Sequence, residues 1–348
     1  MSMVLSDSAR ARGLAKPRLG FLGAGWIGRH RMEAVLEAGV AEATAIAEPS
    51  EECMRAAADL SPSAKRVDTL EALFREDIDG IVIATPSALH AQQAVEALEQ
   101  GMPVFCQKPL GRARSEVQAV VVAAEKADRL LGADFSYRHT EAMRRIRPVL
   151  SSGEIGQVHA VDLTFHNAYG PDKTWFYDPA LSGGGCLIDL GVHLVDLALW
   201  ALDFPEVVKV ESHLFAEGEK LPPNPSVVED FAVATLTLKT GTIIRLTCSW
   251  RLHAGQDAQI SAAFYGTQGG LALRNVGGSF YDFRAERYRG TESETISEPP
   301  DDWGGRAIVD WARQLSRNPG FNPEAKRFVQ VAEIIDRLYG RDLDARPD

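Results

Sequence analysis

The chain has 348 residues, of which 45% are hydrophobic, and its 37 basic and 48 acidic side chains give a formal charge of −11. This length exceeds what one hydrophobic core usually supports, so we expect two domains in an ordinary soluble globular protein. Residues 1–150 have net charge −1 and residues 151–348 have net charge −10, so neither half offers the basic face that nucleic-acid binding requires.

Targeting and membrane signals are weak along the chain. No apolar run approaches the ~18 residues that span a bilayer. Basic residues precede the apolar residues 19–27, as in a signal peptide, but that stretch is short, is broken by three glycines and is followed by Arg29, His30 and Arg31. We expect a cytoplasmic protein with no membrane partner and with a flexible tail over residues 1–16.

The cysteines and histidines show no metal-binding spacing. Cys53, Cys106, Cys186 and Cys248 are far apart and form no C-x-x-C pair, and none of the eight histidines pairs with another at metal-ligand spacing. We therefore expect buried thiols, with no disulfide framework and no metal.

Short apolar runs alternate with longer amphipathic runs over residues 17–136. The predicted strands are residues 18–22, 43–47, 78–84, 103–106 and 130–135. The predicted helices are residues 28–38, 50–60, 88–100 and 115–127. Such alternation is typical of βαβ units, so residues 17–140 are predicted to form an α/β Rossmann domain with a doubly wound parallel sheet.

After a predicted helix at residues 140–151, strands follow one another through tight turns. These strands are residues 156–165, 207–215, 230–238, 242–250, 259–265 and 270–273. Helices are predicted at residues 186–202, 303–317 and 323–339. The pattern indicates an α+β domain with a mostly antiparallel sheet over residues 141–348.

A glycine-rich turn follows the first predicted strand and opens the first helix. Residues 23–28 read GAGWIG, which fits G-x-G-x-x-G. In such a turn the first glycine allows the bend, the second lets a pyrophosphate approach the backbone and the third lets helix and strand pack closely. Glu48 follows the next strand, where an acid accepts hydrogen bonds from ribose hydroxyls, so we predict NAD rather than a plain structural turn.

A second turn, TPSALH at residues 85–90, follows the buried strand at residues 78–84. Its position at the carboxyl edge of the sheet favours ligand binding. The alternative is a proline turn in which Ser87 caps the next helix.

These segments together resemble the Gfo/Idh/MocA family, which includes glucose–fructose oxidoreductase and inositol dehydrogenase. The resemblance covers residues 17–339 and rests on the two turns above, on Glu48-Pro49, on Gln107-Lys108-Pro109 and on GGGCLIDLGVHLVDL at residues 183–197. It implies a nicotinamide cofactor, a sugar, polyol or related substrate, and a second domain built on an open, mostly antiparallel sheet. The family pattern has Glu where this chain has Gln107, so the contribution of that position is open.

The cofactor contacts predicted from these motifs include backbone and side-chain groups of both turns. They are Gly23, Gly25, Trp26, Ile27, Gly28, Glu48, Thr85, Pro86, His90, Gln107 and Lys108.

The predicted helix at residues 186–202 is apolar almost all round, yet Asp189, His193 and Asp196 form one polar stripe at i, i+4 and i+7. Burying such groups is costly unless they are paired or functional. An imidazole has a suitable intrinsic pKa to take a hydroxyl proton, so His193 is the predicted base, and Asp189 would orient it or the substrate. The structural alternative is that Asp189 suits the helix dipole and that Asp196 holds His193.

Lys108 follows the predicted strand at residues 103–106. An ammonium group at this strand end can hold the reacting oxygen and stabilise alkoxide charge, whereas the alternative is a solvated loop charge. The catalytic residues predicted from the pattern and the resemblance are therefore Lys108, Asp189 and His193.

Substrate contacts are predicted where aromatic and amide groups follow strands. Tyr137 and Arg138 match a region that lines the family's cleft, His166, Asn167 and Tyr169 end a strand, and an aromatic run at residues 175–178 precedes the glycine triplet. The predicted substrate residues are Tyr137, Arg138, His166, Asn167, Trp175, Asp189 and His193.

The leading function is NAD-dependent oxidation of a sugar or polyol hydroxyl, or the reverse reduction. Alternatives are an enzyme that retains NAD and cleaves a glycosidic bond by transient oxidation and elimination, and a non-catalytic dinucleotide sensor. We also expect a homodimer or homotetramer formed through the second sheet, because both faces of the strand at residues 230–238 are fairly apolar.

Overall fold

The computed structural model describes residues 16–341, which divide into two units. Among the described residues, the first comprises residues 16–110, Gln118–Asp134 and Gly305–Lys326, and the second comprises Gly111–Val117, Phe135–Gly304 and residues 327–341. The predicted tail at residues 1–16 lies, apart from Lys16, outside the described residues.

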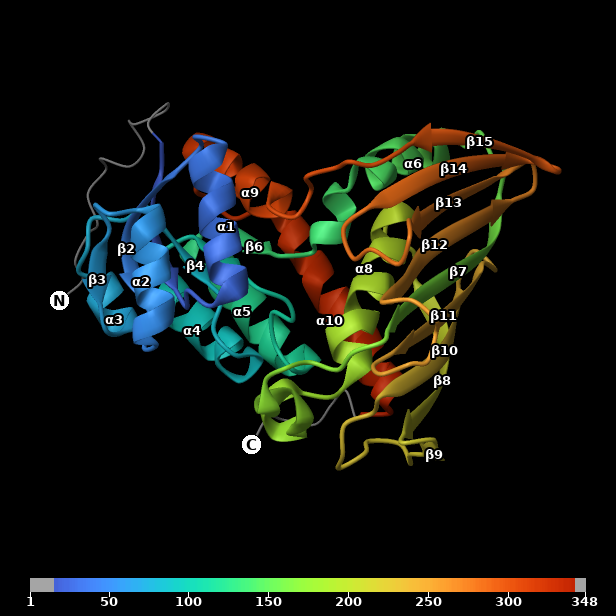
Figure 1. Cartoon of the computed structure of the whole chain (residues 1–348), viewed down its shortest axis with the longest axis horizontal. Coiled ribbons are helices and arrows are strands. Elements are labelled where there is room, and N and C mark those ends of the chain that lie inside the picture. The colour runs from blue at the N-terminus through green and yellow to red at the C-terminus, as the bar shows by residue number, and fades with distance from the viewer. Residues whose placement is uncertain (1–15, 342–348) are drawn as a thin grey trace. The chain divides into compact units, whose positions relative to one another are not determined.

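The first unit contains a six-stranded sheet whose paired strands are all parallel. The strands are β1 (Arg18–Leu22), β2 (Glu42–Ala47), β3 (Lys65–Val67), β4 (Gly80–Ile83), β5 (Val104–Cys106) and β6 (Leu131–Ala133). Their order is β3-β2-β1-β4-β5-β6, which confirms the predicted Rossmann fold (Figure 1). The order reverses between β1 and β4, and ligands of such sheets bind at the carboxyl ends of the strands beside this point.

The helices of this unit are α1 (Trp26–Glu37), α2 (Glu51–Leu60), α3 (Leu70–Leu73), α4 (Ser87–Glu99), most of α5 (Arg114–Ala127) and α9 (Arg306–Arg317). The sequence pattern places α9 in the second domain, whereas the structure places it in the first unit. A Cβ on Gly80 would lie 3.0 Å from the side chains of both Trp311 and Leu315, and the Trp311 ring lies 5.7 Å from that of Phe105. The apolar face of α9 therefore completes the core of the Rossmann unit, where glycine lets it approach the strands.

The second unit contains a nine-stranded sheet of order β15-β14-β13-β12-β7-β11-β10-β8-β9. Its strands are β7 (Val158–Asn167), β8 (Val207–Ala216), β9 (Glu219–Lys220), β10 (Phe231–Leu238), β11 (Ile243–Ser249), β12 (Ala258–Gly266), β13 (Gly270–Asn275), β14 (Phe283–Arg289) and β15 (Glu292–Ser297). Only the β7–β11 pair is parallel among the described strand pairs of this sheet, so the sheet is mixed and mostly antiparallel, in agreement with the predicted fold class.

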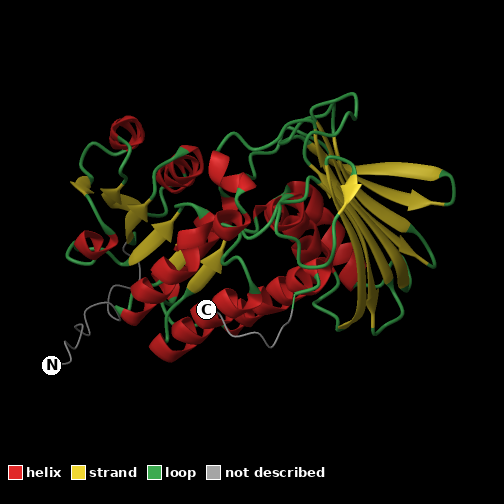
Figure 2. Cartoon of the chain, turned by 90° about the horizontal axis from the view of Figure 1, so that it is seen from below, coloured by secondary structure: helices red, strands yellow, loops and turns green. Residues whose placement is uncertain are grey.

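Helices cover one face of this sheet, and no helix of residues 16–341 in this unit covers the other (Figure 2). The helices of this unit are η2 (Ser136–His139), α6 (Glu141–Ser151), η3 (Thr174–Tyr177), α7 (Pro179–Ser182), the π-helical turn η4 (Leu187–Gly191), α8 (Val192–Ala201) and α10 (Lys326–Tyr339), while η5 (Pro323–Ala325) precedes α10. Of these, α6, η4 and α8 pack against strands of the sheet. The alternate residues of β10 from Ala232 to Leu238 are buried beneath the helices, whereas Val233 on the other face is 39% exposed.

The helical run Pro179–Ala201 is 23 residues long, and its most apolar 18-residue window has a mean hydropathy of 1.4. By length and composition it could span a membrane, so the expectation that no run approaches this length was wrong. However, 89% of that window is buried inside the protein, as in the core helix of a globular domain.

All four cysteines are free thiols, and three of them are buried, as predicted, whereas Cys53 is half-buried. The sulfur atoms of Cys186 and Cys248 lie 4.0 Å apart. Within residues 16–341, no group of three or more histidine, cysteine or acidic side chains could hold a metal ion.

Candidate functional site

The glycine turn between β1 and α1 leaves room for a ligand at its middle glycine. Gly23 has a φ of +87°, and a Cβ there would lie 2.6 Å from the carbonyl oxygen of Ala84. A Cβ on Gly28 would lie 2.3 Å from the carbonyl oxygen of Gly23, so neither position accepts a side chain. A Cβ on Gly25 would meet no described atom within 4 Å. The fold itself therefore tolerates a side chain at Gly25, and glycine there suits a ligand that approaches the backbone.

The N-terminus of α1 is suited to an anion. Gly25 occupies the N-cap without a side-chain hydrogen bond to the helix, and the first turn contains no acidic residue. The first N–H groups of a helix have no partner inside the helix and carry a partial positive charge. Together with the open space at Gly25, this fits a dinucleotide's pyrophosphate.

Glu48 lies at the end of β2, against the glycine turn. Its Oε2 accepts a hydrogen bond from the Ala24 N–H at 2.6 Å, and its Oε1 accepts one from the Ser50 N–H at 2.8 Å. A carboxylate is thus held beside the phosphate-binding turn, where ribose hydroxyls of a dinucleotide would find an acceptor.

Two other cofactor candidates, Trp26 and Ile27, form the first turn of α1. Trp26 is 60% exposed and stacks on His30, with ring centroids 5.5 Å apart, and Ile27 is half-buried.

The TPSALH turn links two loops of the first unit through His90. The buried imidazole has Nε2 2.6 Å from the carbonyl oxygen of Thr85 and Nδ1 2.8 Å from that of Pro109. Thr85 also donates from Oγ1 to Gln93 at 2.6 Å. The alternative in which Ser87 caps α4 was wrong, because Pro86 occupies the N-cap and no side chain caps it. His90 therefore fixes the backbone at both turns.

Lys108 follows β5, between the buried residues Gln107 and Pro109, and is itself half-buried. The Lys108–Pro109 peptide bond is cis. The Gln107 side chain turns inward and donates to Asp134 at 2.6 Å.

In the second unit, the predicted helix over residues 186–202 begins with a π-helical turn. The turn η4 contains Asp189, and α8 contains His193 and Asp196. A π turn accommodates one extra residue and is frequent at functional sites. Asp196 and His193 are buried and Asp189 is half-buried, so the polar stripe does enter the core.

Asp189, His193 and Tyr137 gather from η4, α8 and η2. Trp250 donates from Nε1 to Asp189 Oδ2 at 3.1 Å, and the Tyr137 ring packs edge-on against the His193 ring with centroids 4.9 Å apart. Burial, with the negative charge of Asp189 as a second cause, raises the pKa of the Tyr137 phenol, which therefore stays a neutral donor. A carboxylate, an imidazole and a phenol in contact with aromatic rings suit proton transfer with a hydroxylated ligand.

Asp196 has a different role from the other two residues of the stripe. Both of its carboxylate oxygens accept hydrogen bonds from Arg138, at 2.7 Å from Nε to Oδ2 and closer still from Nη2 to Oδ1. Burial raises the pKa of Asp196, and the Arg138 guanidinium opposes this rise. The ion pair with Arg138 accounts for the burial of Asp196, so the alternative in which Asp196 holds His193 is not needed. The guanidinium of Arg138, a predicted substrate contact, is therefore occupied by this carboxylate.

The remaining predicted substrate residues lie at one end of β7 and in η3. His166 Nδ1 is 2.8 Å from Ser249 Oγ, and Asn167 Oδ1 accepts from the Tyr169 N–H at 2.8 Å. Trp175 stacks on Phe176 at 3.8 Å between ring centroids. Phe176 in turn meets Trp250 edge-on at 6.3 Å, which connects this aromatic group with the tryptophan that bonds Asp189.

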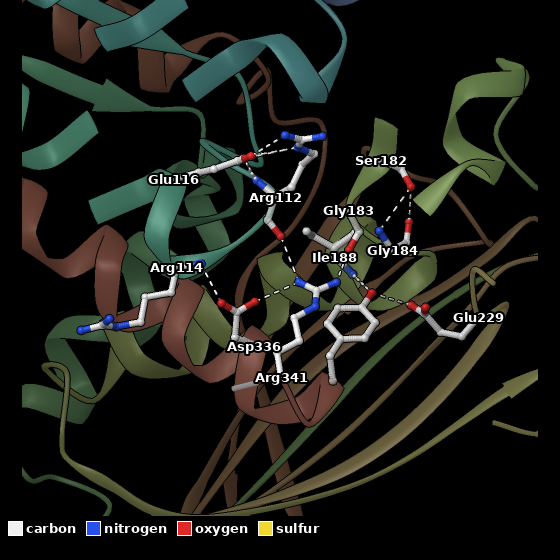
Figure 3. A network of polar contacts seen from close by, with 11 residues as sticks. Arg112, Arg114, Glu116, Ser182, Gly183, Gly184, Ile188, Glu229, Asp336 and Arg341 are labelled. Atoms are coloured by element: carbon white, nitrogen blue, oxygen red, sulfur yellow. Dashed lines mark hydrogen bonds and ion pairs between the residues drawn. The ribbon is translucent and has the colours of Figure 1, made fainter. Parts of the chain in front are cut away.

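The start of the helix that bears Asp189 and His193 is held by a buried polar network (Figure 3). Glu229, which is fully buried, accepts from the N–H groups of Gly185 at 3.0 Å and Leu187 at 2.7 Å. Tyr339 donates from its hydroxyl to Glu229 Oε1 at 2.8 Å and accepts from the Ile188 N–H at 3.2 Å. A Cβ on Gly185 would lie 1.9 Å from the Glu229 carbonyl oxygen, so the glycine triplet permits this close approach.

Arginines extend this network to the loop that precedes the helix. Arg341 donates to the Gly183 carbonyl oxygen and, at 3.0 Å, to that of Arg112, and Arg112 pairs with Glu116 (Figure 3). The segment of residues 183–188 is thus fixed at both ends.

Sequence reasoning missed Trp250, Glu229, Tyr339, Arg31 and Asp134. Two of them left a usable signal: Glu229 directly precedes a predicted strand, and Asp134 lies near the end of another, where polar side chains of a sheet often serve ligands.

Comparisons with known proteins agree with this architecture. Residues 18–135 match the model described as the oxidoreductase family, NAD-binding Rossmann fold, and residues 143–272 match the GFO/IDH/MocA C-terminal domain. D-glucoside 3-dehydrogenase of Escherichia coli K12 is 26% identical over 277 residues, which are 75% of this chain and 76% of that protein. Myo-inositol 2-dehydrogenase of Thermotoga maritima is 24% identical over 349 residues, covering 91% and 99% of the two chains.

A solved structure shares the fold. Levoglucosan dehydrogenase in complex with NADH and L-sorbose superposes with a TM-score of 0.79 at 21% identity, covering 93% of this chain and 96% of that one. Both halves of the chain match models of one family, and the sheet order and glycine turn agree with it. The chain therefore belongs to the Gfo/Idh/MocA family of NAD(P)-binding sugar and polyol oxidoreductases.

Proposed function

We propose that this protein is an NAD-dependent dehydrogenase that transfers hydride between a hydroxyl or carbonyl group of a sugar, polyol or related compound and the nicotinamide. The observation that carries the proposal is the arrangement of Asp189, His193 and Tyr137 in the second unit. A dinucleotide-binding scaffold without catalysis has no use for a half-buried carboxylate, a buried imidazole and a phenol around one point.

The glycine turn with the α1 N-terminus would hold the pyrophosphate, and Glu48 would hold the adenine ribose. The TPSALH and Gln107-Lys108 turns are proposed as further cofactor contacts. When bound, NAD supplies the hydride acceptor, and the chain's own residues must then deal with the proton and the substrate oxygen.

His193 acts in this proposal as the base that removes the hydroxyl proton, and as the acid in the reverse direction. Asp189, with one oxygen held by Trp250, orients the imidazole or the substrate hydroxyl. Lys108 holds the reacting oxygen and stabilises the negative charge that grows on it. The Tyr137 hydroxyl, kept neutral by burial, is available as a hydrogen-bond donor to the substrate.

The aromatic group of Trp175, Phe176 and Trp250 is proposed to contact the substrate ring, with Asn167 and His166 as polar neighbours. Arg138 contributes indirectly, because its guanidinium is engaged by Asp196.

The proposed preference for NAD over NADP rests on Glu48. Its carboxylate lies against the glycine turn and would repel a 2′-phosphate, and Glu51 and Glu52 follow in α2. We expect discrimination of about 100-fold in kcat/KM, since like-charge juxtaposition commonly costs a few kcal/mol. The measurement is kcat/KM for both cofactors with one good substrate. Glu48→Ser should narrow the ratio, and equal values in the unaltered protein would refute the assignment.

The experiment that tests the function is a screen of the purified protein with NAD. Sugars, sugar acids, inositols and amino sugars are supplied in turn, and formation of reduced nicotinamide is followed by its absorbance. Net reduction with any of them supports the dehydrogenase. A protein that keeps its NAD through purification, shows no net reduction and cleaves glycosides would instead be the eliminating glycosidase.

We also propose a homodimer or homotetramer in the cytoplasm, formed through the face of the nine-stranded sheet that no described helix covers. Val208, Val233 and Ile243 are exposed on its strands. Light scattering that shows a monomer at micromolar concentration would refute this assembly.

A further inference from the structure

Three side chains of the first unit form a buried polar group that the mechanism above does not use. Asp134 lies after β6, Gln107 lies after β5 and Arg31 lies on α1, and their exposed fractions are 1%, 6% and 5%. We call these residues the Asp134 cluster. Asp134 Oδ2 accepts from both Gln107 Nε2 and Arg31 Nε, each at 2.6 Å.

The cluster is electrically balanced only with an amide at position 107. The Asp134 carboxylate and the Arg31 guanidinium neutralise each other, and Gln107 adds a donor without charge. A glutamate at this position, as in the family pattern, would set a second carboxylate 2.6 Å from the first, and two carboxylates so close cannot both ionise without a large cost. Gln107 and Asp134 therefore depend on each other.

The cluster holds the chain immediately before Lys108. The Gln107 N–H donates to the Ile83 carbonyl oxygen at 2.9 Å, and the Asp134 N–H donates to that of Cys106 at 3.0 Å. His90 fixes the residue after Lys108 through the Pro109 carbonyl oxygen. The buried side chain of Gln107 adds a side-chain anchor to this turn.

We propose that Asp134 is a positioning residue for Lys108, and that it supplies from the end of β6 a carboxylate in place of the glutamate that the family pattern carries at position 107. This inference rests on the proposed role of Lys108. Asp134 Oδ1 is buried and has no hydrogen-bond partner within residues 16–341, so the hold on the turn runs through the single oxygen that both donors share.

The test is an exchange of the two groups: Gln107→Glu, Asp134→Asn and the double variant. Gln107→Glu adds an unpaired buried negative charge, and Asp134→Asn leaves Arg31 unpaired. In the double variant, the amide now at position 134 can accept from Arg31 and donate to the carboxylate now at position 107, so charges and hydrogen bonds are balanced again.

We expect each single variant to lower kcat by about 10-fold or more, since displacement of a reacting group by about 1 Å costs up to ~100-fold. The double variant should recover a kcat within about 3-fold of that of the unaltered protein.

Asp79→Asn is the matched control. Asp79 forms an ion pair with Arg18 at the opposite, amino-terminal edge of the same sheet, at 3.0 Å from Nη2 to Oδ1. This variant loses an Arg–Asp pair and melts earlier, but its kcat should equal that of the unaltered protein.

A second readout does not depend on activity. The rate at which an amine-reactive ester modifies Lys108 is followed by peptide mass spectrometry, and we expect each single variant to react faster and the double variant to react at the original rate. The proposal would be overturned if the kcat losses of the two single variants multiplied in the double variant. It would also be overturned if the single variants left both kcat and the labelling rate unchanged. If Gln107→Glu does not fold, the double variant decides, because it must fold and be active. Near-normal turnover of Lys108→Ala would refute the role of Lys108, whereas the labelling rates would still show whether Asp134 positions it.

Discussion

The two units present different kinds of chemical group at their candidate site residues. In the first unit, the groups offered to the cofactor are mostly backbone N–H groups of a glycine turn and the uncapped N-terminus of α1. In the second unit, they are side chains on one helical run, whose start is held by Glu229 and Tyr339. Substitutions should therefore act differently: an added Cβ in the glycine turn of the first unit should weaken NAD binding, and a lost polar atom around the helical run of the second unit should lower turnover.

The largest effects are expected from the side chains proposed to handle the proton and the oxygen. His193→Ala and Lys108→Ala should each lower turnover by at least ~100-fold, the scale of losing a general base or a charge stabiliser. NAD binding, measured by titration, should survive His193→Ala, because the glycine turn belongs to the first unit. Near-normal turnover of this variant across the pH range would show that another group is the base.

In the glycine turn, Gly25→Ala and Gly28→Ala form a matched pair of variants that each add a Cβ, the first in open space and the second against the backbone. Gly25→Ala places a Cβ in open space at ordinary backbone angles, so its melting temperature should stay within about 1–2 °C of the original while the KM for NAD rises ~10-fold or more. Gly28→Ala places a Cβ 2.3 Å from the Gly23 carbonyl oxygen and should destabilise the fold itself. Thermal melts and NAD titration separate the two outcomes. An unchanged KM in Gly25→Ala would mean that no ligand approaches this part of the turn.

How far the sequence predicts the structure differs between the units for a physical reason. The strands β1 and β4 of the first unit are almost entirely buried, so their apolar runs stand out, and β1 begins and ends at the predicted residues. The strands β14 and β15 were missed, because charged side chains interrupt their apolar pattern: Arg284 and Glu286 are half-buried on β14, and Glu294 is exposed on the edge strand β15. The π turn was missed as well, since apolar residues surround the whole helix and show no change of period there.

The site follows the same division. Gly23, Gly25, Gly28 and Glu48 could be predicted because a local motif defines them. The residues that support the helix bearing Asp189 and His193 were not predicted, since their contacts join distant segments: Trp250 lies 61 positions from Asp189, and Tyr339 lies 110 positions from Glu229. Such pairs leave no local spacing to read.

A smaller effect is expected from the network of Glu229 and Tyr339, which holds the start of the helix that bears Asp189 and His193. In the unaltered protein, the backbone N–H groups of Gly185 and Leu187 each donate to one carboxylate oxygen of Glu229. Glu229→Gln replaces one of these oxygens with an N–H₂ group, which cannot accept a hydrogen bond, so one of the two N–H groups loses its acceptor. We expect kcat to fall by about 10-fold with an unchanged KM for NAD, because Asp189 and His193 move while the glycine turn does not. Tyr339→Phe should act in the same direction.

The control for this network is Tyr288→Phe. Tyr288 donates to Glu286 at 2.7 Å within β14, so the variant loses the same kind of tyrosine–glutamate bond in the same unit, away from the helix. Its kcat should be unchanged. Equal losses in Tyr339→Phe and Tyr288→Phe would mean that the network at residues 183–188 serves stability alone.

The smallest expected effect is a pH dependence of stability from His166. Burial lowers the pKa of this imidazole, whose Nδ1 lies 2.8 Å from Ser249 Oγ. Between the lowered pKa and the ordinary value near 6.5, the unfolded chain binds more protons than the folded one. The contribution to stability is therefore fully present above about pH 6.5 and is lost as the pH falls through this range, by at most ~1.4 kcal/mol per pH unit for one proton. His166→Asn keeps a hydrogen-bonding group but cannot titrate, so the decrease in its melting temperature between pH 7 and pH 5 should be smaller, by a few degrees, than that of the unaltered protein. Parallel melting curves for the two proteins over this range would show that the ring is as easily protonated in the folded chain as in water.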